Sequence, residues 1–171
     1  MTLPTLHITA DHIKGGVYIG PDVSNYEGHI EIDANLGWVK FEFYLCATGC
    51  ILAEAGTGIK AGDGIKAGTG IEAAWGIDAG DGIKAGDGIK AGMGIEAGKD
   101  IEASFSIRAK WISAKLRIFA GLVNGRLPKN GEDEIHAQLR SGTIAFGKHI
   151  APIIDTHAPV SEGVDVFPGE G

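Results

Sequence analysis

The sequence predicts an all-β protein: a three-sided parallel β-helix, or solenoid, of hexapeptide repeats with β-rich caps at both ends. Three observations predict this fold. A six-residue period runs without interruption from residue 58 to 107, apolar and charged side chains alternate within it, and glycine takes about two of every six positions. A repeat that cannot bury its own apolar face must stack on its neighbours, as the units of a solenoid do.

Each repeat has the form Ile-X-Ala-Gly-X-Gly. Isoleucine occupies every sixth position from Ile59 to Ile107, alanine follows two positions later, and the residue between them is nearly always charged. Ile and Ala therefore face one side of an extended chain and the charge faces the other. The apolar spacing does not follow a helical period, and each interior glycine would cost a helix roughly 0.8–1 kcal/mol relative to alanine. Collagen needs glycine at every third residue, so we expect short strands separated by turns in which glycine adopts positive φ.

The number of hexads per turn follows from the variable positions. With 18 residues per turn, Trp75, Met93 and Trp111 form one column with Thr57 at its end, whereas 12 residues per turn would mix the tryptophans with Asp87 and Lys99. The longer period also brings charged positions of opposite sign next to each other, which favours cross-strand pairs. We therefore expect three hexads per turn.

The repeat resembles the left-handed parallel β-helix proteins with hexapeptide repeats, over roughly residues 53–120. The GIKAG and GIEAG units, the segment 116–121 and the segment 142–147 also resemble small uncharacterised proteins encoded by phages and mobile elements. Some genes near those proteins encode anti-defence or anti-CRISPR proteins. The first resemblance implies the fold, and for many members of that family acyl transfer. The second implies a phage setting and assigns no residue a role.

The sequence suggests four segments. Residues 1–52 read as a β-rich N-terminal cap, and residues 53–121 as the hexapeptide β-helix, in which Leu116 is expected to face inward. Residues 122–149 read as a C-terminal cap containing a hairpin around Arg140-Ser141-Gly142, because two β-like runs flank that turn. Residues 150–171 contain three prolines and no periodicity, so we expect an extended or disordered tail.

The charge distribution limits the classes of partner. The net charge is −7, and both ends of the chain are acidic while the repeat is nearly neutral. Direct nucleic-acid binding is not expected, because it needs a concentrated basic surface. Solubility explains the acidity as well as competition for a nucleic-acid site does. A candidate acidic surface comprises five residues of the N-terminal region: Asp11, Asp22, Glu27, Glu31 and Asp33.

The sequence offers little for catalysis, cofactors or metals. An acyltransferase needs a histidine base, and no histidine lies between Ile30 and Ile135. No phosphate-binding loop, dinucleotide fingerprint or nucleophile motif occurs. Cys46 and Cys50 form an isolated Cys-X3-Cys without a second pair, so two reduced thiols are expected rather than a metal site. We expect no catalytic residue, no cofactor and no metal.

No apolar run is long enough to span a membrane, and we expect a cytoplasmic protein, in the host cytoplasm if a phage encodes it.

These observations favour a non-catalytic solenoid that binds another protein or protein complex, with inhibition of a host defence complex as one form of that role. The candidate binding stripe is apolar and comprises Trp75, Met93, Trp111 and Phe105. Trp and Met are enriched in the centres of protein interfaces. Coverage of the stripe by another part of the chain, or by a second copy in a homodimer, remains an alternative. Hexapeptide-repeat acyl transfer and a purely structural role are the alternative functions.

Overall fold

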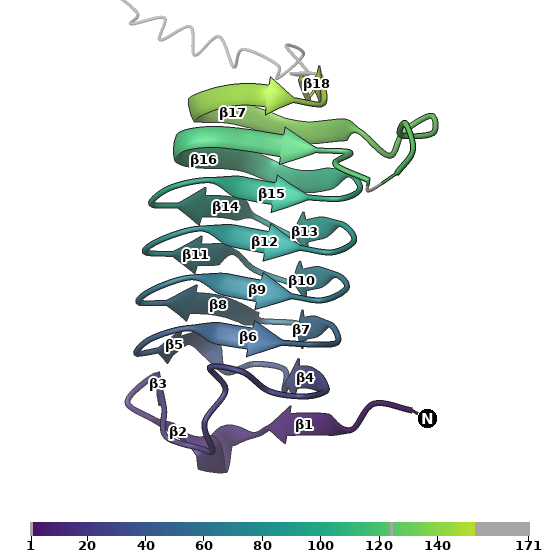
Figure 1. Cartoon of the computed structure of the whole chain (residues 1–171). Coiled ribbons are helices and arrows are strands. Elements are labelled where there is room, and N and C mark those ends of the chain that lie inside the picture. The colour runs from purple at the N-terminus through teal and green to yellow at the C-terminus, as the bar shows by residue number, and fades with distance from the viewer. Residues whose placement is uncertain (1, 124, 153–171) are drawn as a thin grey trace, which may run out of the picture.

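The computed structural model describes residues 2–123 and 125–152. It is a parallel β-solenoid of about five turns, which confirms the predicted all-β solenoid. The coils stack from β1, nearest the N-terminus, to β17 and β18 at the other end (Figure 1). One short 3-10 helix, η1 (Ala10–His12), interrupts the strands, and none of the described residues belong to a helix long and apolar enough to cross a membrane.

Successive coils pair in parallel, and most strands pair with the third strand along the chain, which sorts them into three ladders. The first ladder contains β1 (Thr5–Ile8), β4 (His29–Ile32), β7 (Ile51–Ala53), β10 (Ile71–Ala73) and β13 (Ile89–Ala91). The second contains β3 (Val17–Tyr18), β5 (Gly37–Phe41), β8 (Thr57–Ala61), β11 (Ile77–Ala79) and β14 (Gly94–Ala97). The third contains β6 (Leu45–Ala47), β9 (Ile65–Ala67), β12 (Ile83–Ala85) and β15 (Ile101–Ala103), which lie in front in Figure 1.

Two long strands run around the corners and continue all three ladders. They are β16 (Ile107–Ala120), which pairs with β13, β14 and β15, and β17 (Glu134–Phe146), which pairs along β16. The short strand β18 (Lys148–Ile150) pairs with the start of β17. At the other end, β2 (Ile13–Lys14) pairs with β3 in antiparallel orientation.

In the centre of the stack, residues that pair between successive coils are eighteen positions apart in the sequence. Ile71 pairs with Ile89, and Ile77 pairs with Ile95, so three hexads complete one turn there. The coil before this region is longer, because its turns carry extra residues, and the following coil is one residue shorter, because Ile95 pairs with Ile112. In each case an aliphatic side chain stays above an aliphatic side chain.

The core is the column of isoleucine and alanine side chains inside the coils. From Ile59 to Ala103, every Ile and Ala of the hexads is buried, while the residue between them faces outward. Burial of each isoleucine contributes roughly 1.5–3 kcal/mol, so the register that keeps Ile over Ile is strongly favoured.

The glycines of the repeat serve close packing rather than unusual backbone angles. We expected positive φ in the turns, yet the glycines with positive φ lie outside the regular hexads. The first glycine of each turn lies against the preceding coil: a Cβ at Gly80 would be 2.0 Å from the carbonyl oxygen of Gly62, and one at Gly98 would be 1.9 Å from that of Gly80. A side chain added here without a backbone shift would collide with the preceding coil, which explains why glycine recurs in most hexads; Ala74 and Ser104 occupy the equivalent position in the other two.

The two ends continue the stack of coils. Thr5–Ile8 already pairs in parallel with His29–Ile32, so the N-terminal residues form the first coils of the stack. Alternating burial in β4 and β5 supplies the same inward face as the hexads, although the turns between these strands are longer and irregular.

At the other end, the expected hairpin around Gly142 is a single strand, β17. Ile135, Leu139 and Ile144 lie over the buried isoleucines of β16, so one more parallel coil buries more apolar surface than a separate hairpin would. Gly142, with φ of 96°, turns the chain at a corner without reversing it. Leu116, expected inside, is 50% exposed because it lies at the corner between two buried segments. Most of the expected tail, 153–171, lies outside the described residues.

Candidate functional site

One corner of the solenoid carries a line of residues joined by backbone hydrogen bonds from coil to coil. Trp75 N–H donates to the Thr57 carbonyl at 3.1 Å, and Met93 N–H donates to the Trp75 carbonyl at 3.0 Å. The predicted column of Thr57, Trp75 and Met93 is therefore present. Its next member is Lys110, whose N–H donates to the Met93 carbonyl at 2.7 Å, and not Trp111.

Trp111 is displaced by one position because the coil that contains it is one residue shorter. Ile112 lies over Ile95, and this pairing places Trp111 beside Gly94. Only two residues, Lys110 and Trp111, separate Ala109 from Ile112, whereas the regular hexads place three residues between the alanine and the next isoleucine. The register is set by the burial of isoleucine, and this register determines the position of Trp111.

Two tryptophan rings cover a column of glycines beside this line. A Cβ at Gly94 would lie 2.0 Å from Cε2 of Trp111, which means that the ring rests on the glycine backbone. The Trp38 ring rests in the same way on the earlier glycines of the column, 3.0 Å from the Cβ position of Gly58 and 2.8 Å from that of Gly76. All three glycines are buried. Glycine is needed at these places because any side chain would occupy the space of an indole ring.

Trp38 is a site residue that the sequence reasoning missed. The signal was present, because Trp38 immediately precedes the buried Val39 as Trp111 precedes the buried Ile112. The structure pairs Trp38 with Gly58, in the second ladder that also pairs Gly94 with Trp111. Alignment of the chain on its buried aliphatic residues brings both tryptophans into one column.

A cleft of about 200 Å³, which we call the tryptophan cleft, lies at this corner. Its walls and floor are formed by Trp38, Gly76, Ile77, Asp78, Met93, Gly94, Glu96 and Trp111. Pockets for drug-sized ligands and cofactors enclose roughly 300–1,000 Å³. The tryptophan cleft therefore suits a single side chain better than a whole cofactor.

Two carboxylates line the cleft, and they differ in their partners. Asp78 forms an ion pair with Lys60 of the preceding coil. Glu96 lies in register with Asp78 on one side and Ser113 on the other, and no ion pair reaches it from the described part of the chain. Acidic groups directly opposite each other repel, so Glu96 is a negative charge that lacks compensation.

In the regular hexads of the other two ladders, the outward glutamates pair with lysines of neighbouring coils. Glu72 pairs with Lys90 at 2.5 Å and Glu102 with Lys84 at 2.7 Å. Each pair joins the outward position of one hexad to the same position eighteen residues away. Glu96 occupies the same outward position, but no lysine or arginine of the described residues forms an ion pair with it.

Trp111 already binds a cation of the same chain. The guanidinium carbon of Arg140 lies 4.0 Å from the centre of the Trp111 ring, a cation–π distance. Among the residues that the structure describes, no such cation lies over Trp38. Trp38 is 41% exposed, so its outer surface is open to an external group.

The remaining predicted site residues lie elsewhere. Phe105 is half-buried at a different corner, where its N–H donates to the Asp87 carbonyl, so it does not extend the line of Trp75 and Met93. The five acidic residues lie in the N-terminal coils: Asp11 in η1, Asp22 and Glu27 in the loop before β4, Glu31 in β4 and Asp33 after it. Hydrogen bonds from Ser24 lower the pKa of the Asp22 carboxyl, and Glu31 lies 3.1 Å from His7. Within residues 2–123 and 125–152, the five acidic residues do not line one common cleft.

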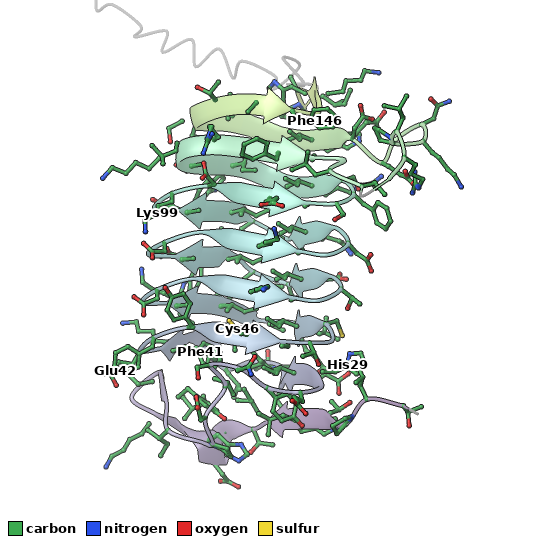
Figure 2. The ribbon with its side chains drawn as sticks, viewed as in Figure 1. His29, Phe41, Glu42, Cys46, Lys99 and Phe146 are labelled. Atoms are coloured by element: carbon green, nitrogen blue, oxygen red, sulfur yellow. The ribbon has the colours of Figure 1, made fainter. Side chains whose placement is uncertain are left out.

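The two cysteines are free and half-buried, and they lie on different parts of a coil. Figure 2 shows Cys46 on the face of the third ladder and His29, which contacts Cys50, at the right-hand edge. Burial raises the pKa of the Cys46 thiol more than nearby Lys66 lowers it. His29 Nδ1 accepts a hydrogen bond from the Cys50 N–H at 3.0 Å, which fixes the turn before β7.

No protein-family model, curated protein or solved structure matches this chain. The function must therefore be argued from the surface itself, and the tryptophan corner, defined as Trp38, Trp75, Met93, Trp111 and Glu96, is the part of that surface with the most specific chemistry.

Proposed function

We propose that this protein is a non-catalytic solenoid that binds another protein through the tryptophan corner. The observation that carries the proposal is the grouping of three large apolar side chains that remain exposed: Trp38 at 41%, Trp75 at 38% and Met93 at 48%. Trp and Met are typical of the buried centre of protein interfaces, and tryptophan is among the residues that contribute most to binding.

The rigidity of the corner supports the proposal. The ladders hold its backbone, and the Trp38 and Trp111 rings rest on glycine backbone, so these two rings lose little conformational entropy when a partner covers them. The adjacent charged positions supply a polar rim. Such a surface can bind without rearrangement of the coils.

A catalytic role finds less support. The tryptophan cleft contains carboxylates and aromatic rings but neither histidine nor cysteine among its lining residues. The hexapeptide-repeat acyltransferase reading needs a histidine base beside a groove for the acyl donor. A shift in melting temperature on addition of coenzyme A would favour that alternative, since a ligand that binds only the folded state stabilises it.

Inhibition of a host defence complex by a phage protein is one form of this proposed binding role, and the identity of the partner would test it. The test compares capture of proteins from the native host by wild type and by the double variant Trp38→Ala/Trp75→Ala. Phe43→Ala is the matched control, because Phe43 is 63% exposed and lies outside the tryptophan cleft.

We expect one partner to be retained by wild type and by Phe43→Ala and lost by the double variant. Phe43→Ala should melt close to wild type, and the double variant somewhat lower because it removes the Trp38 ring from its glycine surface, so capture is compared at a temperature at which all three proteins are folded. Equal capture by all three would place the interface elsewhere. A host defence complex as the partner would support inhibition, and a second copy of this chain would instead support a homodimer.

A further inference from the structure

The tryptophan cleft combines a free aromatic surface with an uncompensated carboxylate. Trp38 rests on buried glycines with its other side open, and Glu96 lines the same cleft between Asp78 and Ser113. An aromatic ring attracts a cation over its surface, and a carboxylate attracts a cation at its edge. Both features favour the same kind of ligand group.

The cleft is too small for a cofactor and too apolar for a hydrated metal ion. Its volume is about 200 Å³, and rings, Met93 and glycine backbone form most of its lining. Calcium and magnesium prefer several oxygen ligands, whereas one of the two carboxylates here is already paired with Lys60. A flat organic cation satisfies the lining better.

The molecule itself contains an example of the contact. Arg140 stacks on Trp111 with a distance of 4.0 Å from the guanidinium carbon to the ring centre. Guanidinium groups are planar, stack on aromatic rings and bind carboxylates through paired hydrogen bonds. A second guanidinium on Trp38 would repeat this geometry at the open end of the cleft and would neutralise Glu96.

We propose that the tryptophan cleft binds an arginine side chain of the protein partner, stacked on Trp38 and paired with Glu96. This inference rests on the proposed function and specifies its chemistry. The remaining exposed residues, Trp75 and Met93, then contact apolar groups that flank the arginine in the partner. The arginine of the partner provides local charge complementarity to Glu96. Lys40, Lys60, Asp78 and Glu96 follow one another along this ladder, Lys60 pairs with Asp78, and Glu96 has no ion-pair partner among the described residues.

The first test uses the intact protein and a minimal probe, the peptide N-acetyl-Gly-Arg-Gly-amide. Its matched control carries citrulline in place of arginine, which keeps the shape and removes the charge. Binding is followed by the indole N–H signals of the three tryptophans in NMR spectra. We expect the arginine peptide to shift the Trp38 signal with a weak, saturable affinity and the citrulline peptide to leave it unchanged. Equal shifts with both peptides, or none with either, would overturn the inference.

The second test uses variants. Glu96→Gln and Trp38→Leu should each weaken the arginine peptide by about two- to fivefold, the range expected for exposed ion pairs and cation–π contacts. Glu102→Gln is the control, because Glu102 holds the equivalent outward position of the third ladder and pairs with Lys84. Affinity that is the same in Glu96→Gln and Glu102→Gln would contradict the pairing with Glu96.

The outcomes separate this inference from the proposed function. One outcome is that the captured partner is lost in Trp38→Ala/Trp75→Ala but retained in Glu96→Gln and not displaced by the arginine peptide. That result would support the interface at the tryptophan corner and contradict the binding of an arginine. If the peptide binds as expected but no partner depends on the corner, the proposed function fails while the cleft retains its preference for a guanidinium.

Discussion

Trp111 lies flat on Gly94, so closely that a Cβ on the glycine would lie 2.0 Å from the indole ring. Arg140 stacks on the same ring. The contact joins the last regular hexad to the first long strand, β16, at the point where the register changes from eighteen to seventeen residues.

Gly94→Ala should displace the Trp111 ring. The added methyl group takes the place of the indole, which must move toward solvent and lose its contact with Arg140. We expect a red shift of the tryptophan emission and a destabilisation of about 1–3 kcal/mol, as for other overpacked sites. Gly70→Ala is the control, because the nearest atom to its Cβ position is 3.5 Å away. An unchanged emission spectrum in Gly94→Ala would show that the ring does not rest there in solution.

Gly80→Ala tests the close packing of successive coils. Its Cβ would lie 2.0 Å from the carbonyl oxygen of Gly62, so the backbone of one coil must shift against the other to accept it. We expect the free energy of unfolding, measured in urea, to fall by about 1–3 kcal/mol. Gly70→Ala should be neutral or slightly stabilising, because alanine restricts the unfolded chain. Similar unfolding midpoints for the two variants would contradict this role of the first glycine.

The two tryptophans of the predicted column should differ in their contribution to stability. Trp111→Ala removes a half-buried ring from its glycine surface and should cost about 2–3 kcal/mol, somewhat below the cost for a fully buried aromatic residue. Trp75→Ala should change stability by no more than about 0.5 kcal/mol, because the side chain is an exposed one. Thermal unfolding monitored by circular dichroism measures both, and equal losses would mean that Trp75 is covered, as in a homodimer.

Glu132 should titrate at unusually low pH. Hydrogen bonds from Arg126, with a further one from the Lys129 N–H, lower the pKa of Glu132 to about 2. A depressed pKa in the folded state means that the ionised carboxylate stabilises the loop above the ordinary glutamate pKa, and this contribution is lost as the pH falls through about 2. Carbon NMR of the carboxyl group measures the midpoint. Arg126→Gln should return it toward the ordinary range, and a normal midpoint in the wild type would rule out the ion pair.

Much of the fold follows from the sequence because the repeat is regular. The period of Ile and Ala determines which side chains are buried, and the central register of eighteen residues follows from the requirement that like positions stack. The same rule, applied to Ile112 instead of to Trp111, would have predicted the shortened coil and the pairing of Trp111 with Gly94. It would also have predicted β17 as another coil, since its aliphatic residues lie over those of β16.

The role of glycine could not be read from the sequence in the same way. A Gly-X-Gly turn is consistent with positive φ and with close approach of backbone, and local chemistry does not distinguish the two. Only the packing of one coil on the next shows that Gly80 and Gly98 are held against carbonyl oxygens of the preceding coil.

The sequence by itself determined the solenoid, its core and the charged outward positions, because these depend on a short-range alternation that every hexad repeats. The tertiary structure decided the site. Trp38 and Trp111 are separated by most of the repeat, and they share one glycine column only because successive coils bring equivalent positions into register. The cleft between them, and the uncompensated charge of Glu96 within it, arise from contacts between coils, which no single hexad contains.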